Sequence, residues 1–143
     1  MNAPLPPHSI EAEQGLLGAI LMYGSKALDR IEDVIKPADF YREEHRRIYA
    51  AAKAQHDAGK NVDVVTVSDA LTAAGHAERT GVIAYLGELA ASCLSAANVK
   101  RYAEIVRQRA TLRALQQLAT DLQSACAAGD NRDPAEIAAE LEA

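Results

Sequence analysis

The segment formed by residues 95–128 constrains the fold more than any other feature of the sequence. On a helical wheel of about 100° per residue, the apolar residues of its first half share one direction, and those of its second half share another, about 165° away. The two groups are Val99, Tyr102, Ile105 and Val106, and Leu115, Leu118, Leu122 and Cys126. We therefore expect one long helix whose first half packs on a globular head and whose second half projects from it.

The second half repeats its apolar residues at spacings of three and four, as a helical hairpin or a short coiled coil requires. Residues 129–132 then predict a turn, and Asp133-Pro134 predicts the capped start of another helix. That helix is too short to be stable alone, so it should pack back on its neighbour. It reaches Ala143 without a closing signal, so we expect a domain boundary or a fragment end to truncate the second arm.

The rest of the chain predicts an arm and a helical head. Three prolines within residues 1–8 indicate an extended, mobile arm, which is followed by a head over 9–94 and the hairpin over 95–143. Alanine, the best helix former, supplies about a fifth of the residues and favours closely packed helices. The expected head helices cover residues 9–24, 26–35, 39–59, 64–74 and 80–91, the last with Ile83, Leu86 and Leu89 facing inward. The fold class is therefore all-α.

One stretch of the head is ambiguous, because VDVVTV at 62–67 is β-branched and has the propensity of a strand. It continues without a turn signal into SDALTAAG, which is helical and ends in glycine. A single strand with no partner would be unstable. We therefore expect a helix over 64–74.

Charge and composition exclude several classes of function. The net charge of −5 provides no global attraction for nucleic acid or acidic membranes. The sequence contains neither a membrane-spanning segment nor a signal peptide, so we expect a cytoplasmic protein. Cys93 and Cys126 lie far apart and outside any CxxC pair, which favours two buried free thiols over a disulfide or a metal site.

No motif for catalysis, cofactors or metals emerges. The only GK pair, Gly59-Lys60, is followed by asparagine where a P-loop requires serine or threonine. His45, His56 and His76 have no good zinc ligands three or four residues away, and His8 lies on the arm, so ordinary histidines are the favoured interpretation. His45 and Glu44 are the weak remaining support for an enzyme. We therefore expect no catalytic residue, no metal site and no cofactor in this chain.

One cluster departs from the acidic average, since five basic residues crowd the first half of the long helix, beside the single acid Glu104. They are Lys100, Arg101, Arg107, Arg109 and Arg113. Single-stranded DNA or an acidic partner could bind them. The favoured alternative is that their aliphatic stems cover the head while their charges reach water.

Four strings resemble the DnaB replicative helicase family in order and spacing: PPHSIEAEQGLLGAIL at 6–21, DFYREEHRRIY at 39–49, AYLGELA at 84–90 and SAANVKRYAEIVRQRATLR at 95–113. The resemblance extends from Pro6 to about Leu122. It implies the family's N-terminal domain, a compact six-helix head followed by a helical hairpin. It also implies that the RecA-like ATPase domain, which uses ATP and Mg²⁺ in the family, is missing from this sequence.

The resemblance implies partners as well. Family domains pair through their hairpins into dimers, and three dimers form the collar of the hexameric helicase, which recruits the helicase-binding C-terminal domain of primase. The family's primase contacts match Glu11, Tyr85 and Leu122 here, whereas Gln116 stands at a hairpin position that is often aliphatic. Core packing remains an equally good interpretation of Tyr85 and Leu122.

The leading hypothesis is a non-catalytic collar domain that binds itself and primase during DNA replication. It predicts that Leu115, Leu118 and Leu122 form an exposed apolar strip that a partner covers. A single-stranded DNA-binding module is the first alternative. A stand-alone phage or plasmid regulator that mimics the helicase collar is the second.

Overall fold

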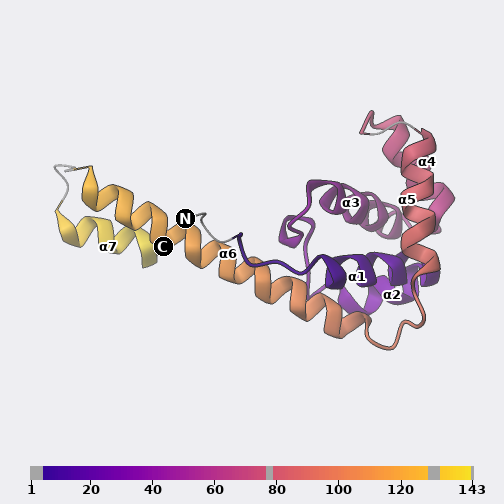
Figure 1. Cartoon of the computed structure of the whole chain (residues 1–143), viewed down its shortest axis with the longest axis horizontal. Helices are drawn as coiled ribbons and strands as arrows, with labels where there is room; N and C mark the ends of the chain where they lie inside the picture. Colours follow the sequence, from indigo (N-terminus) through magenta and orange to yellow (C-terminus); the bar gives the residue numbers. More distant parts are fainter. Residues whose placement is uncertain (1–4, 77–78, 129–132, 143) are drawn as a thin grey trace. The chain divides into compact units, whose positions relative to one another are not determined.

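The computed structural model describes residues 5–76, 79–128 and 133–142, and the regular secondary structure of these residues consists of helices without strands, which confirms the predicted all-α class (Figure 1). The helices are α1 (Ile10–Tyr23), α2 (Ser25–Ile31), the 3-10 helix η1 (Pro37–Asp39), α3 (Glu43–Asp57), α4 (Val64–Ala73), α5 (Arg79–Ala91), α6 (Val99–Ala127) and α7 (Pro134–Glu142). The chain forms two compact units: the head, His8–Ala110, and a second unit that combines residues up to Pro7 with those from Thr111 onward. The division falls inside α6.

Helix α1 forms the centre of the head, because it packs against α5, α2 and α3. It begins at Ser9, whose Oγ accepts a hydrogen bond from the Ala12 amide at 3.2 Å. Its three leucines and Ile20 are almost fully buried. A Cβ atom at Gly18 would lie 2.4 Å from the Leu89 carbonyl oxygen, so only glycine lets the α1 and α5 backbones approach this closely.

The β-branched segment is a helix, as predicted. Asp63 caps α4 by accepting a hydrogen bond from the Thr66 amide at 2.8 Å, and the Thr66 hydroxyl accepts one in return from the Asp63 amide at 3.1 Å. Val67 and Leu71 then bury one face of α4 against the core. The reciprocal cap and the buried face together outweigh the strand propensity of the valines.

Several predicted boundaries were wrong by a few residues, for local reasons. The second helix ends at Ile31 instead of residue 35, and Pro37 opens η1. The third begins at Glu43 instead of residue 39, because the amides of Tyr41 and Arg42 donate to Glu13. The long helix begins at Val99 instead of residue 95, since Ser95 Oγ accepts a hydrogen bond from the Ala97 amide in a turn.

One predicted inward residue of the head was also wrong. Leu86 and Leu89 of α5 are buried as expected, but Ile83 is 38% exposed. Ile83 lines a surface hollow beside Val65 of α4. The inward face of α5 therefore follows Leu86, Leu89 and Ala90.

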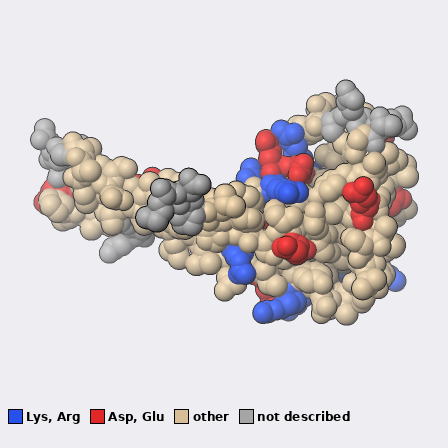
Figure 2. Space-filling view, viewed as in Figure 1, with Lys and Arg blue, Asp and Glu red and all other residues tan. Residues whose placement is uncertain are grey.

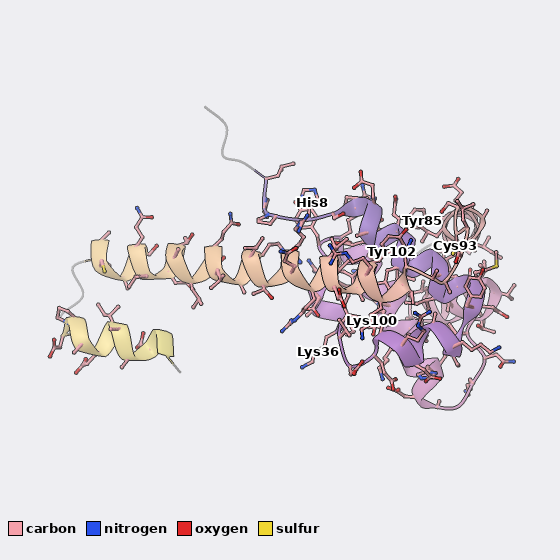
Figure 3. All side chains as sticks on the ribbon, turned by 90° about the horizontal axis from the view of Figure 1, so that it is seen from below. His8, Lys36, Tyr85, Cys93, Lys100 and Tyr102 are labelled. Atoms are coloured by element: carbon pink, nitrogen blue, oxygen red, sulfur yellow. The ribbon has the colours of Figure 1, made fainter. Side chains whose placement is uncertain are left out.

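The buried residues of α6 all lie in its first half: Val99, Ala103 and Val106. From Thr111 to Ala127 the side chains are exposed or half-buried. In the second unit, Asp133 caps α7 by accepting a hydrogen bond from the Ala135 amide at 3.2 Å, and α7 returns alongside the end of α6 (Figures 1 and 3). Among the described helices, none is both long enough and apolar enough to cross a membrane.

Candidate docking surfaces and a buried polar network

Three polar side chains from three helices form a buried network inside the head. Glu13 of α1 and His45 of α3 are 1% and 0% exposed, and Glu13 Oε1 lies 2.7 Å from His45 Nδ1. The opposite ring nitrogen, Nε2, lies 2.6 Å from the hydroxyl of Tyr85 in α5. The imidazole and phenol rings are nearly parallel, at 2°. The network therefore joins α1, α3 and α5 through hydrogen bonds.

The hydrogen bonds keep Glu13 ionised. Burial alone would raise the pKa of this carboxyl, but hydrogen bonds from His45 and from the Tyr41 and Arg42 amides hold it below its usual value. An ionised carboxylate can only accept, so His45 Nδ1 carries the proton in this bond. In the neutral imidazole, Nε2 then accepts the hydroxyl proton of Tyr85.

The hydroxyl of Tyr85 therefore points into the network, and its ring remains available to line a surface pocket. Gln14 Nε2 also donates to this hydroxyl, at 3.5 Å. The ring lines a pocket of about 350 Å³ between α3 and α5. Apolar walls come from Ile48, Val82 and Leu86, and Glu44, Arg47 and His76 also line the pocket. An apolar hollow with a few charges is a suitable site for a protein partner's side chain.

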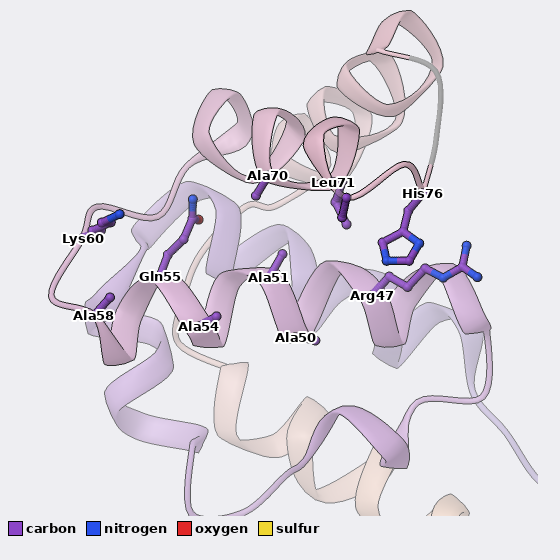
Figure 4. A pocket seen from close by; sticks show the side chains of 11 residues that line it. Arg47, Ala50, Ala51, Ala54, Gln55, Ala58, Lys60, Ala70, Leu71 and His76 are labelled. Atoms are coloured by element: carbon purple, nitrogen blue, oxygen red, sulfur yellow. The ribbon is translucent and has the colours of Figure 1, made fainter.

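A second hollow adjoins this pocket through shared residues. An open groove of about 470 Å³ lies between α3 and α4, and alanines make up much of its lining. Figure 4 shows the side chains that line it. Arg47, Leu71 and His76 line both the groove and the Tyr85 pocket. The groove and the pocket therefore share part of their lining.

Glu11, the predicted acidic contact, lies in the first turn of α1 and is exposed. Two residues further along, Glu13 is the buried acid of the network. The same short string thus supplies one acid to the surface and one to the interior. The sequence contained no signal that separated these two roles.

The three leucines of the predicted strip, Leu115, Leu118 and Leu122, lie on the second half of α6 and are 55%, 43% and 37% exposed. Leu112, one turn earlier, is 40% exposed. These residues recur at spacings of three and four and so share one helix face. We call Leu115, Leu118 and Leu122 the leucine strip. The sequence prediction of its exposure is confirmed.

The five predicted basic residues do not form one uncompensated patch. Arg107 Nη1 lies 2.8 Å from Asp39 Oδ1, and Arg101 Nη1 lies 3.6 Å from Glu104 Oε2. Arg109 donates to Gln108 at 2.8 Å, while Lys100 is exposed at the start of α6 (Figure 3). In the second unit, Arg113 Nη1 donates to the Pro7 carbonyl at 2.7 Å.

On the visible face of the head, basic and acidic side chains are interspersed (Figure 2). This pattern provides little support for the single-stranded DNA alternative, which stays a prediction.

One expectation about chemistry was wrong. The thiols were expected to be buried, but Cys93 is half-buried and Cys126 is exposed. The expectation of no metal site stays a prediction, although Asp29 and Glu32 face His56 across the contact between α2 and α3. A search by spacing within one helix cannot detect such a group.

Comparison with known proteins identifies the family. The sequence profile described as "DnaB-like helicase N terminal domain" matches residues 5–108. The replicative DNA helicase DnaC of Bacillus subtilis is 43% identical over 122 residues, which cover 85% of this chain and 27% of that protein. DnaB of Geobacillus stearothermophilus is 42% identical over 118 residues, covering 82% and 26%. The chain thus spans about a quarter of the length of these relatives.

A solved structure supports the same assignment. The crystal structure of the N-terminal domain of DnaB helicase from Mycobacterium tuberculosis superposes with a TM-score of 0.89 at 33% sequence identity, and the match covers 96% of both chains. Profile, sequence and fold agree over the head. The chain belongs to the DnaB-like helicase N-terminal domain family.

Proposed function

We propose that this chain acts as a non-catalytic collar domain of a replicative DNA helicase in the cytoplasm. It associates with further copies through the leucine strip of α6, and it binds primase through the pocket that Tyr85 lines. No chemistry is assigned to the chain itself. ATP hydrolysis and Mg²⁺ binding belong to a RecA-like domain outside this sequence.

The exposure of the leucine strip is the observation that carries the proposal. The leucines are only 37–55% exposed, so a partner that covers the rest of each side chain contributes on the order of 1 kcal/mol per leucine, because apolar surface leaves water. Three partly exposed leucines on one helix face resemble the seam of a helical pair. The membership in a helicase family adds support for self-association.

Primase docking is the finer part of the proposal. The hydroxyl of Tyr85 is engaged by His45, so the ring and the neighbouring apolar walls supply the contact area. Aromatic rings held rigidly at the wall of a pocket are frequent contributors to binding energy. We therefore expect the partner to insert an apolar side chain beside this ring.

A calorimetric titration with the C-terminal domain of primase from the same genome tests docking, with the mass of the chain measured by light scattering. Tyr85→Phe keeps the ring and should preserve affinity, whereas Tyr85→Leu should weaken it at least tenfold. Saturable binding with this pattern supports docking at the pocket. Equal affinities of the two variants would contradict it.

The strip is tested separately through Leu122→Ser, with Leu94→Ser as the matched control. Leu94 is 96% exposed and lies in the head, outside both proposed surfaces. Only the Leu122 variant should reduce self-association. A chain that remains monomeric at high concentration and does not bind primase would contradict both parts of the proposal.

A further inference from the structure

The contact between α2 and α3 brings together three donor groups that the collar function does not use. His56 Nε2 of α3 lies 3.0 Å from Asp29 Oδ1 and 3.3 Å from Glu32 Oε2. All three ligand atoms lie within 4.8 Å of one another. Asp29 belongs to α2, and Glu32 follows directly as its C-cap. We propose that Asp29, Glu32 and His56 form a binding site for a divalent transition-metal ion of the zinc type.

The distances fit a shared metal ion. Nitrogen and oxygen ligands lie about 2.0–2.2 Å from zinc, so two ligands at the tetrahedral angle are about 3.4 Å apart. The two separations from His56 Nε2 are close to this value. One imidazole and two carboxylates are also the donor set that zinc accepts, with the fourth position left to water.

The second ring nitrogen orients the imidazole for this role. His56 Nδ1 lies 3.0 Å from Ser25 Oγ, at the start of α2. When Nε2 binds a metal, Nδ1 carries the proton and can donate it to this hydroxyl. The side chain of His56 is only 14% exposed, whereas Asp29 and Glu32 are 65% and 38% exposed, so the ring is fixed and the open side faces solvent.

The local charge also favours a cation. Lys53 Nζ lies 2.6 Å from Asp57 Oδ1 and 3.5 Å from Glu32 Oε2. Its closer partner is Asp57, so Lys53 can keep that bond while Glu32 turns toward the metal. The Asp29 and Glu32 carboxylates then repel one another unless a cation lies between them. A bound ion would connect the exposed end of α2 to α3.

Zinc chloride titrated into the chain by calorimetry tests the site. The chain carries Cys93→Ser and Cys126→Ser, so that no thiolate competes. We expect one ion per chain, and a loss of affinity of at least tenfold in His56→Gln. His76→Gln is the matched control, because His76 is exposed and lies apart from the three ligands, and it should leave affinity unchanged.

Two further variants keep the test decisive if His56→Gln perturbs folding. Asp29→Asn alters an exposed side chain and should weaken zinc binding at least tenfold while the circular dichroism spectrum stays unchanged. Lys53→Gln removes the ammonium that competes for Glu32 and should strengthen binding. No zinc binding by the parent chain, or equal binding by the Asp29, His56 and His76 variants, would overturn the proposal. Weaker binding by Lys53→Gln would exclude Glu32 as a ligand and overturn this three-residue site.

Discussion

Glu13 lies inside the head, where its carboxylate accepts hydrogen bonds from the His45 ring and from the Tyr41 and Arg42 amides. These bonds stabilise the ionised form in the folded chain and hold the pKa of Glu13 below its usual value of 4.5. Because the pKa is lowered by folding, the carboxylate contributes stability above about pH 4.5. That contribution is lost as the pH falls through the lowered value.

Glu13→Gln should therefore lower the free energy of unfolding by about 1–3 kcal/mol at pH 7, since charged hydrogen bonds are lost inside the head. The difference between the parent and the variant should shrink as the pH falls below about 4.5. Urea unfolding from pH 7 to pH 3 measures both effects. Glu11→Gln is the matched control, because Glu11 is exposed two residues earlier, and this variant should unfold with a free energy close to that of the parent at pH 7. A difference that stayed constant down to pH 3 would contradict the role of the charge.

Tyr85→Phe should separate stability from docking at the same position. Removal of the hydroxyl leaves His45 Nε2 buried without its 2.6 Å partner, which costs about 1–3 kcal/mol. Chemical denaturation should show this loss, whereas Tyr23→Phe, at a 42% exposed tyrosine, should unfold like the parent. Equal stability of both variants would mean that the hydroxyl does not support the fold.

Sequence reasoning could not find this network, because its members lie far apart along the chain. His45 is 32 residues from Glu13 and 40 from Tyr85, while helical spacing compares only neighbouring turns. The family resemblance pointed to Tyr85 without indicating what its hydroxyl contacts. The metal-capable group of α2 and α3 was missed for the same reason.

At the scale of the elements, the close packing of α1 against α5 depends on Gly18. A Cβ atom at Gly18 would collide with the Leu89 carbonyl oxygen, whereas one at Gly87, within α5, would meet nothing within 4 Å. Alanine at either position raises helix propensity by about 1 kcal/mol. Substitution of the two glycines therefore separates the effect of helix packing, at Gly18, from the effect of helix propensity, at Gly87.

Gly18→Ala should destabilise the head by about 1–3 kcal/mol, because the helices must move apart. Gly87→Ala should leave stability unchanged or raise it by up to about 1 kcal/mol. Thermal or urea unfolding of the two variants is a direct comparison. A stable Gly18→Ala variant would show that α1 and α5 can separate at no cost.

Element type was more predictable than element boundaries. The helix at Val64–Ala73 was predictable because the valines continue without a turn signal into a helical, glycine-terminated stretch, and capping by Asp63 explains why the β-branched residues adopt it. The start of α3 depended instead on two amides that bind Glu13 of α1, which no local pattern shows. Helix boundaries that depend on side chains far away in the sequence therefore could not be predicted from local patterns.

At the scale of the whole chain, the two apolar directions of α6 predicted that its halves have different surroundings. The buried residues Val99, Ala103 and Val106 belong to the head, and the leucine strip is exposed in the second unit. The sequence identified this strip because helical periodicity is local. The covering of this strip by a partner stays a prediction.

Simultaneous change of Leu115, Leu118 and Leu122 to serine should weaken self-association at least a hundredfold, about 3 kcal/mol, because a symmetric pair would lose six apolar contacts. Light scattering over a concentration series measures this change. The three side chains are 37–55% exposed in the single chain, so its unfolding free energy should shift by no more than about 0.5 kcal/mol per site. Weaker association without loss of stability would identify the strip as an assembly surface. A large loss of stability with unchanged association would instead mean that α6 uses these leucines within its own chain.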